Sequence, residues 1–152
     1  MQNEKLDDLD KSILVDLMRN GRTPFLELAR KFNVSSGTIH VRVDKMKEAG
    51  IITGTKVMID HKKLGLDVTC YIGIILKTAK DYPLVLNNLK LFDEVIEVHY
   101  TTGNYGLFIK VMTKSIDELQ NFLIKKLQAI KEISSTETII SLANPLSKDI
   151  TP

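Results

Sequence analysis

The chain has 152 residues, of which 43% are hydrophobic and 26% charged, and its formal net charge at pH 7 is +2. This composition predicts a globular protein of one or two small domains. No apolar run approaches the roughly 18 residues that cross a membrane. The N-terminal MQNEKLDD also lacks the apolar centre of a signal peptide. We therefore expect a cytoplasmic protein without a membrane span.

The first predicted element is a helix over residues 6–20. Three aspartates, Asp7, Asp8 and Asp10, stand at its start, where the helix dipole favours negative charge. An apolar stripe follows at helical spacing, formed by Leu9, Ile13, Leu14 and Leu17. This pattern predicts the first helix of a three-helix core.

Residues 24–50 contain two helical patterns separated by a break at residues 33–35. Apolar residues recur at helical spacing on both sides of the break: Phe25, Leu28, Ala29 and Phe32 before it, and Ile39, Val43 and Met46 after it. Asn33 suits the left-handed conformation of a sharp helix end. Ser35 or Ser36 can cap the next helix, and Gly50 suits its end. Two short helices and a three-residue turn predict a helix-turn-helix.

The second of these helices is the candidate for reading DNA. When its apolar stripe faces the core, small and polar residues lie on the opposite face, where they can approach base edges in a major groove. Thr38, His40 and Val41 are the best candidates for base contact. Arg42 projects beside the apolar stripe and can hold a phosphate, brace the motif or read a base. The predicted DNA-binding residues are Arg22, Ser35, Ser36, Gly37, Thr38, His40, Val41, Arg42 and Lys45.

Positive charge is concentrated around this motif. All four arginines lie in or beside it: Arg19, Arg22, Arg30 and Arg42. From residue 19 to residue 47, seven basic residues stand against two acidic ones, a local excess of five. An ordinary αα-hairpin is the alternative on pattern alone. The clustered charge favours phosphates instead, and double-stranded DNA is the predicted partner.

The segment after the motif is predicted to leave the first domain. Residues 51–60 contain two short β-prone runs about a possible turn at Gly54, which predicts a small wing or one strand leading out. Residues 61–67 are polar, contain Gly65 and are predicted to be a hinge. The predicted domains are therefore a DNA-binding domain at 1–60, a hinge at 61–67 and a second domain at 68–152.

From residue 68 onward, strands and helices alternate in the predicted order βαββαβ. Strands are expected at residues 68–77, 95–101, 105–112 and 136–142, and helices at 82–91 and 115–130. This order is the split βαβ unit of a ferredoxin-like fold, an antiparallel sheet with both helices on one face. The predicted fold class is α+β, a winged-helix-like helix-turn-helix followed by a ferredoxin-like domain.

The predicted strands are apolar on both faces. In the first strand, Cys70, Ile72 and Ile74 alternate with Tyr71 and Ile75. Two helices cover only one face, and a second apolar face marks an association site. We therefore expect a homodimer formed through the sheets, which suits the half-sites of a palindromic operator.

Two segments of the second domain could hold a small ligand. Residues 100–106, YTTGNYG, join the two central strands, and their two glycines leave backbone N–H groups open to a carboxylate. The alternative is that these residues simply form a tight hairpin with a Gly-Asn turn and bind no ligand. Residues 134–138, SSTET, gather hydroxyls that could bind a zwitterion beside that loop, although such clusters are common in loops.

Motifs of catalysis or metal binding do not occur in the sequence. There is no P-loop, G-x-S-x-G, H-E-x-x-H or C-x-x-C. His40, His61 and His99 are scattered, and with the single Cys70 they make no credible zinc site. We expect no catalysis, no metal and no cofactor, and we expect Cys70 to be a buried hydrophobe.

The chain resembles the Lrp/AsnC family of amino-acid-responsive transcription regulators in four stretches. Three lie before the hinge, LDDLDKSILVDLMRNGR, ELARKFNVS and GTIHVRVDKMKEAGII, and the fourth, TTGNYGLFIKV, lies after it. The likeness covers nearly the whole chain, and KMKEAGIITG and STETIISL are similar to asparagine-responsive members. The resemblance implies dimers through the sheets, octameric rings of four dimers, and effector pockets between neighbouring dimers. It maps the effector loop onto residues 102–106, with Thr136 and Thr138 nearby. Gly106 departs from the aspartate of many relatives.

We accordingly expect a transcription regulator, activator or repressor, that acts on asparagine biosynthesis genes and responds to a small amino acid, expected to be asparagine. The predicted effector-binding residues are Tyr100, Thr102, Gly103, Asn104, Tyr105, Gly106, Thr136 and Thr138. Within the family, the alternative is a regulator of the leucine-responsive type or one sensing another amino acid. Outside it, the alternatives are an amino-acid-binding or assembly module whose first helices only pack, and a ferredoxin-like enzyme, which would need titratable residues converging in a pocket.

Overall fold

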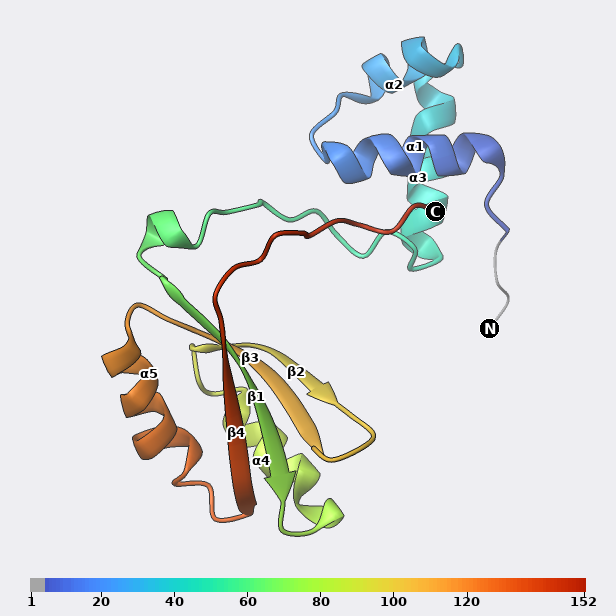
Figure 1. The fold of residues 1–152 in the computed structure, drawn as a ribbon. Helices are drawn as coiled ribbons and strands as arrows, with labels where there is room; N and C mark the ends of the chain where they lie inside the picture. The colour runs from blue at the N-terminus through green and yellow to red at the C-terminus, as the bar shows by residue number, and fades with distance from the viewer. Residues whose placement is uncertain (1–4) are drawn as a thin grey trace. The chain divides into compact units, whose positions relative to one another are not determined.

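The computed structural model describes residues 5–152 and divides the chain into two compact units (Figure 1). One unit comprises the chain up to Met58 together with the tail Leu146–Pro152, and the other comprises Ile59–Pro145. The sequence places the tail in the second domain, whereas the tail groups with the first unit. Each unit has a hydrophobic core of its own.

The first unit contains the predicted helix-turn-helix. Its helices are α1 (Asp8–Arg19), α2 (Phe25–Phe32) and α3 (Ser36–Glu48). The turn before α3 begins at Asn33, which has a left-handed φ of 54°, and Gly50 ends the motif with a φ of 71°. The buried side chains of the three helices form one core: Ile13, Leu28, Ala29, Ile39, Val43 and Met46. The predicted apolar stripes are therefore the ones that pack.

The wing expected after α3 takes a simpler form. Residues 52–60 form neither a strand nor a turn and run as an irregular segment. Ile52 packs against the helical core, and the chain then passes Gly21, where an added Cβ would lie 2.7 Å from Cγ2 of Thr55. The turn expected at Gly54 does not form either, because neither of the two β-prone runs around it is a strand. Neither the β-hairpin of a wing nor the single strand predicted for residues 51–60 forms, although this segment does lead out of the helical core.

The second unit has the predicted βαββαβ order. Its strands are β1 (Val68–Leu76), β2 (Val95–Tyr100), β3 (Leu107–Thr113) and β4 (Ile133–Ser141), and its main helices are α4 (Tyr82–Leu89) and α5 (Ile116–Phe122). Short helical turns occur at η1 (Lys62–Leu64) and η2 (Ala79–Asp81), and the π-helix η3 (Leu123–Leu127) extends α5. The strands form one antiparallel sheet in the order β2-β3-β1-β4.

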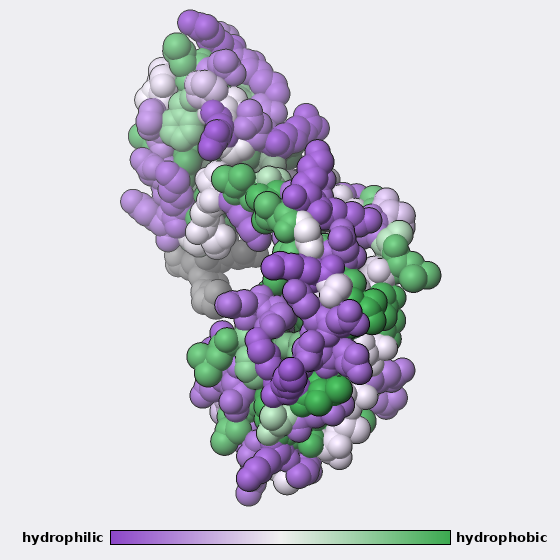
Figure 2. Space-filling model, turned by 90° about the vertical axis from the view of Figure 1, so that its left-hand side faces the viewer, coloured by the Kyte–Doolittle hydropathy of each residue, from purple (hydrophilic) through white to green (hydrophobic). Residues whose placement is uncertain are grey.

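Both helices cover the same face of this sheet (Figure 1). Alternate strand residues such as Cys70, Ile72 and Ile109 are fully buried against Val85 of α4 and Phe122 of α5. Figure 2, viewed from the left-hand side of Figure 1, shows a mostly hydrophilic surface with separate hydrophobic patches. Within residues 59–145, no helix lies on the other face of the sheet.

Of the element boundaries that differ from the sequence prediction, three concern the loop after β2, the last strand and the last helix. β3 begins at Leu107 rather than at residue 105, because the two residues before it close the loop from β2. β4 begins at Ile133, so the hydroxyl-rich residues 134–138 lie within a strand and not in a loop. The last helix changes to π geometry at Leu123, and its final turn ends before Ile130.

Candidate functional site

The N-terminal end of α3 is built by a serine cap. Oγ of Ser35 accepts a hydrogen bond from the backbone N–H of Thr38 at 3.0 Å and lies 2.8 Å from the Thr38 hydroxyl. Ser36 and Gly37 form the first turn of the helix. Capping satisfies a backbone donor that the helix leaves unpaired, so the first turn is held in place. A rigid first turn suits a helix that presents its N-terminal residues to base edges.

The exposed side of α3 carries the residues expected to meet DNA. Val41 is 69% exposed, so its side chain is accessible to a partner on this side of α3. His40 is exposed, and its ring packs edge-on against Phe25 of α2 with 4.5 Å between ring centroids. Lys45 is also exposed, one turn further along. These positions leave an apolar, an aromatic and a basic side chain on one accessible surface.

Arg42 is held inside the motif. One guanidinium nitrogen, Nη1, lies 2.6 Å from Oδ2 of Asp7 and 2.7 Å from Oδ1 of Asp10. The two aspartates also form a capping box at the start of α1. The hydrogen bond from the Asp10 N–H, and after it the bond from Arg42, lower the pKa of Asp7. Of the three roles weighed for Arg42, the structure places it as a brace between α3 and α1.

Some arginine and lysine side chains of this cluster therefore pair with aspartates of the first unit, and others are exposed to solvent. Like Arg42, Lys31 has an internal partner, Asp16, with Nζ 2.6 Å from Oδ2. Arg22 is exposed in the turn between α1 and α2, where its backbone N–H donates to Oδ1 of Asn20. Arg30 is exposed as well. The sequence could not separate these groups, because the pairing aspartates lie on another helix.

The loop between β2 and β3 is closed by three hydrogen bonds. Thr101 donates its hydroxyl to the carbonyl of Tyr105 at 2.8 Å and its N–H to the carbonyl of Gly106 at 3.2 Å. The N–H of Gly106 donates to the carbonyl of Ile74 at 2.9 Å, which ties the loop to β1. Thr102, Gly103 and Asn104 stay exposed at the tip. Gly103 has a φ of 102°, which a residue with a side chain rarely adopts.

Tyr105 leaves this loop and lies on the sheet face that has no helix. An added Cβ on Gly73 would lie 2.6–2.7 Å from three atoms of the Tyr105 ring, so β1 needs a glycine beneath the ring. The hydroxyl of Tyr105 donates to Oε2 of Glu137 on β4. This hydrogen bond raises the pKa of Tyr105. Glu137 was not among the predicted site residues, because only the strand register places it beside the loop.

The strand register separates the other predicted effector residues from Tyr105. Thr136 and Thr138 lie opposite Ile74 and Ile72 of β1, whose side chains are buried beneath the helices. Directly opposed residues share a face, so both threonines point to the helix side. Tyr100 packs against Tyr82 near α4, with 4.5 Å between ring centroids. Within one chain, the predicted effector residues therefore lie at the loop tip and on both faces of the sheet.

The face without a helix is largely apolar along its centre. Tyr71 of β1 and Phe108 of β3 stack with 6.0 Å between ring centroids, and Tyr105 lies 6.1 Å from Phe108. Ile75 is 39% exposed and Ile139 is 50% exposed on the same face. We call this surface, made by Tyr71, Ile75, Tyr105, Phe108 and Ile139, the open face. It has the composition of an association surface.

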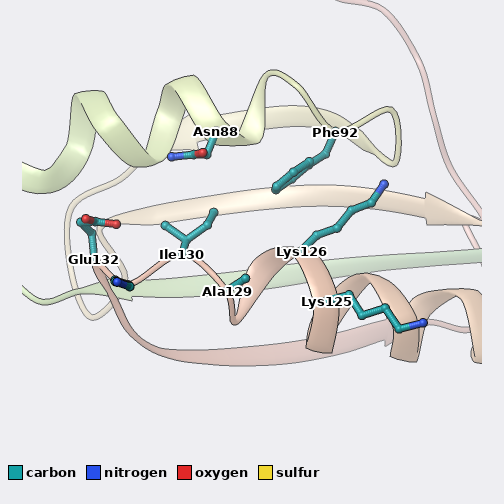
Figure 3. Close-up of a pocket in the computed structure, with 8 residues that line it drawn as sticks. Asn88, Phe92, Lys125, Lys126, Ala129, Ile130 and Glu132 are labelled. Carbon is teal, nitrogen blue, oxygen red and sulfur yellow. The ribbon is translucent and has the colours of Figure 1, made fainter.

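A separate hollow of about 340 Å³ lies on the helix side of the sheet (Figure 3). It is lined by Asn88, Phe92, Lys125, Lys126, Ala129, Ile130, Lys131 and Glu132. Nζ of Lys126 lies 2.7 Å from Oε1 of Glu94. Burial raises the pKa of Glu94, but the hydrogen bond from Lys126 brings it below its ordinary value. The predicted effector residues lie outside the lining of this hollow.

The described residues show no grouping of three histidine, cysteine, aspartate or glutamate side chains that could hold a metal ion. Cys70 is buried in the sheet, and burial raises the pKa of its thiol to about 11. A protonated, buried thiol is a poor nucleophile. In residues 5–152, no helix is both long and apolar enough to span a bilayer.

A helix-turn-helix joined to a ferredoxin-like domain with an open loop defines a class of protein, the DNA-binding regulators that carry a ligand-binding domain. Residues 6–53 match the family described as winged helix-turn-helix DNA-binding. Residues 69–150 match the family described as Lrp/AsnC ligand binding domain. The chain belongs to the Lrp/AsnC family of transcription regulators.

Curated relatives agree with this assignment over the whole chain. "Regulatory protein AsnC" of Escherichia coli K12 is 59% identical over 152 residues, which is 100% of each chain. The protein of the same name from Haemophilus influenzae is 58% identical over 147 residues, 97% of this chain and 98% of the relative. A solved structure described as E. coli AsnC superposes with a TM-score of 0.94 at 58% identity, covering 97% of this chain and 99% of that one. These relatives are regulatory proteins and not enzymes.

Proposed function

We propose that this protein is a cytoplasmic regulator that senses asparagine and controls asparagine biosynthesis genes, as activator or repressor. The observation that carries the proposal is the joining of an exposed recognition helix to a ligand-binding domain in a chain that is 59% identical to a protein named AsnC. A regulator of the same family that senses another amino acid, such as the leucine-responsive type, is the alternative.

The DNA partner we propose is a palindromic operator read by a dimer. Ser35, Ser36, Gly37 and Thr38 present the first turn of α3, while His40, Val41 and Lys45 extend the exposed surface. Arg22 adds an exposed positive charge in the turn between α1 and α2, and Arg42 acts as a brace. Binding of the full chain to an operator fragment should weaken steeply with salt, because released counterions drive it. Binding that does not change between 50 mM and 200 mM salt would contradict this proposal.

We propose that the dimer forms through the open face and that four dimers assemble into an octamer. Aromatic and aliphatic side chains on this face are accessible to a partner with the same face. Phe108→Lys should yield monomers in sedimentation at micromolar concentration. Ile116→Lys, a matched change at an exposed apolar residue of α5, should leave the assembly intact. An unchanged assembly in the Phe108→Lys protein would contradict the proposed dimer face.

We propose that the effector loop, residues 102–106, binds asparagine by its backbone N–H groups. A zwitterion brings a carboxylate that accepts from N–H groups, and the side-chain amide needs both a donor and an acceptor. Asn104 lies at the exposed loop tip. Thr136 and Thr138 point to the helix side, so we assign them to a pocket completed by a second subunit. Tyr100 lies on that same side.

Calorimetry on the full chain tests the effector. Asparagine should bind, and at 100 times its Kd it should stabilise the protein by about 2.7 kcal/mol. Gly103→Val should abolish binding, because a branched side chain does not tolerate the left-handed φ of this position. The same variant should still bind DNA, because its change lies in the other unit. A leucine response without an asparagine response would favour the alternative regulator.

A further inference from the structure

One acidic side chain is fixed against the effector loop. Glu137 stands directly opposite Gly73 in the sheet, and the ring of Tyr105 lies over that glycine. The hydroxyl of Tyr105 donates to Oε2 of Glu137, so the loop itself holds the carboxylate. The hydrogen bonds of Thr101 and Gly106 fix the backbone on both sides of Tyr105. The position of the charge is therefore set by the loop and not by a free side chain.

No other charge belongs to this loop. Residues 100–107, YTTGNYGL, contain neither an acid nor a base, and all four arginines of the chain lie at or before Arg42. On the remaining part of the open face, Glu97 and Lys110 pair with each other at 3.2 Å. Glu137 is thus the carboxylate in direct contact with the loop that we propose holds the effector. The hydrogen bond with Glu137 raises the pKa of Tyr105.

We infer that Glu137 is a specificity-determining residue that makes the effector loop select an amino acid with a neutral amide over its acidic isostere. This inference rests on the proposed function, because it concerns the same loop. Asparagine and aspartate have nearly the same shape and differ by one negative charge. Two negative charges on the order of 8 Å apart repel each other enough to weaken binding about 3- to 30-fold, for effective dielectric constants between water and a protein surface. Glu137 would therefore disfavour a second carboxylate held by the same loop.

The test measures the ratio of the Kd values of aspartate and asparagine by calorimetry on the full chain. The wild-type protein should prefer asparagine. Glu137→Gln keeps the shape and an oxygen that accepts from Tyr105, and it should lower the ratio about 3- to 30-fold, chiefly through tighter aspartate binding. Glu132→Gln is the matched control. It removes the same charge just before β4, but Glu132 lines the hollow of Figure 3, whereas Glu137 is the residue that accepts the Tyr105 hydrogen bond. Its ratio should stay that of the wild type.

A second variant separates charge from fold. Tyr105→Phe keeps the ring over Gly73 but releases the Glu137 carboxylate, so the selectivity should fall by less than in Glu137→Gln. A residue with only a structural role would weaken both ligands equally and leave the ratio unchanged.

The outcomes distinguish the two proposals. Wild-type protein that binds neither ligand would overturn the proposed function, and this inference with it. If the wild-type protein binds asparagine and rejects aspartate, and the Glu137→Gln protein has the same ratio of Kd values, the inference is overturned and the proposed function stands. An equal change of the ratio in Glu137→Gln and Glu132→Gln would also overturn it, because the effect would then belong to net charge and not to the contact with the loop.

Discussion

The helix-turn-helix unit and the sheet unit build their functional surfaces from the chain in different ways. In the first, every residue proposed to read bases lies within one short helix, α3, and its cap. In the second, the effector loop depends on Gly73 of β1 and Glu137 of β4, which are distant in sequence. Helical periodicity places neighbouring residues on one face, whereas a sheet brings together residues that only its register selects. The predictions below test this contrast.

The largest effect should come from the two separate cores. Ile39 lies in the helical core and Ile72 in the sheet core, and both are fully buried. Changing either to alanine should cost about 2–5 kcal/mol of unfolding free energy. Hydrogen exchange should show the loss mainly in the unit that carries the change. Leu26→Ala, at a half-exposed position of α2, is the control and should stay within about 0.5 kcal/mol. Equal loss of protection in both units would contradict independent cores.

The next effect concerns Gly73, where sheet and loop meet. Gly73→Ala should cost about 1–3 kcal/mol in urea denaturation, because its methyl group would overlap the Tyr105 ring. Adding Tyr105→Ala should recover part of the loss by removing that overlap. Gly54→Ala has free space around the new methyl group and should be close to neutral. Identical costs with and without the Tyr105 ring would show that the glycine is needed for another reason.

A smaller effect separates sequence reading from phosphate binding on α3. Thr38→Ala should reduce discrimination between operator and random DNA by about 1 kcal/mol if its hydroxyl reads a base. Lys45→Ala should weaken both DNAs alike and reduce the salt slope by about 1. Ser35→Ala removes the hydroxyl that caps α3 and lies against the Thr38 hydroxyl. Its effect on DNA binding therefore measures how much of the Thr38→Ala effect comes from a loosened helix end. Unchanged affinity and salt slope in the Lys45→Ala protein would remove Lys45 from the interface.

The smallest effect is expected at the brace of the first unit. Arg42→Ala should lower stability near neutral pH by about 1 kcal/mol or less, as for other ion pairs near the surface. The pKa of Asp7 is depressed in the folded protein, first by the Asp10 N–H and then by Arg42. The Asp7 carboxylate therefore contributes to the free energy of unfolding at pH values above its ordinary pKa of 3.8, and this contribution is lost as the pH falls below that value. An acid titration of the helical unit should be shallower in the variant than in the wild type.

Much of the DNA-binding unit could be predicted without coordinates. The stripes of α1, α2 and α3, the left-handed Asn33 and the cap at Ser35 follow from local spacing and local conformational preference. The role of Arg42 could not be predicted in this way. It depends on how α1 packs across α3, which brings Asp7 and Asp10 to its guanidinium.

The sheet unit was predictable in order but not in detail. The βαββαβ pattern and the two apolar faces are visible in the alternation of residues such as Ile74 and Ile75. The start of β4 was placed three residues late, because serine and threonine are common in loops and also pair in strands. The wing was overestimated because β-prone residues need a partner strand before they form one.

The sequence by itself determined the class of fold, the position of the recognition helix and the resemblance to the Lrp/AsnC family. Each of these depends on residues close together in the chain or on spacing that repeats along it. The tertiary structure alone decided that Thr136 and Thr138 lie on the helix side while Tyr105 lies on the open face. It also revealed Glu137 beside the loop. The reason is register: a shift of one residue in β4 would reverse the faces of Thr136, Glu137 and Thr138, and only the packed sheet selects one alignment.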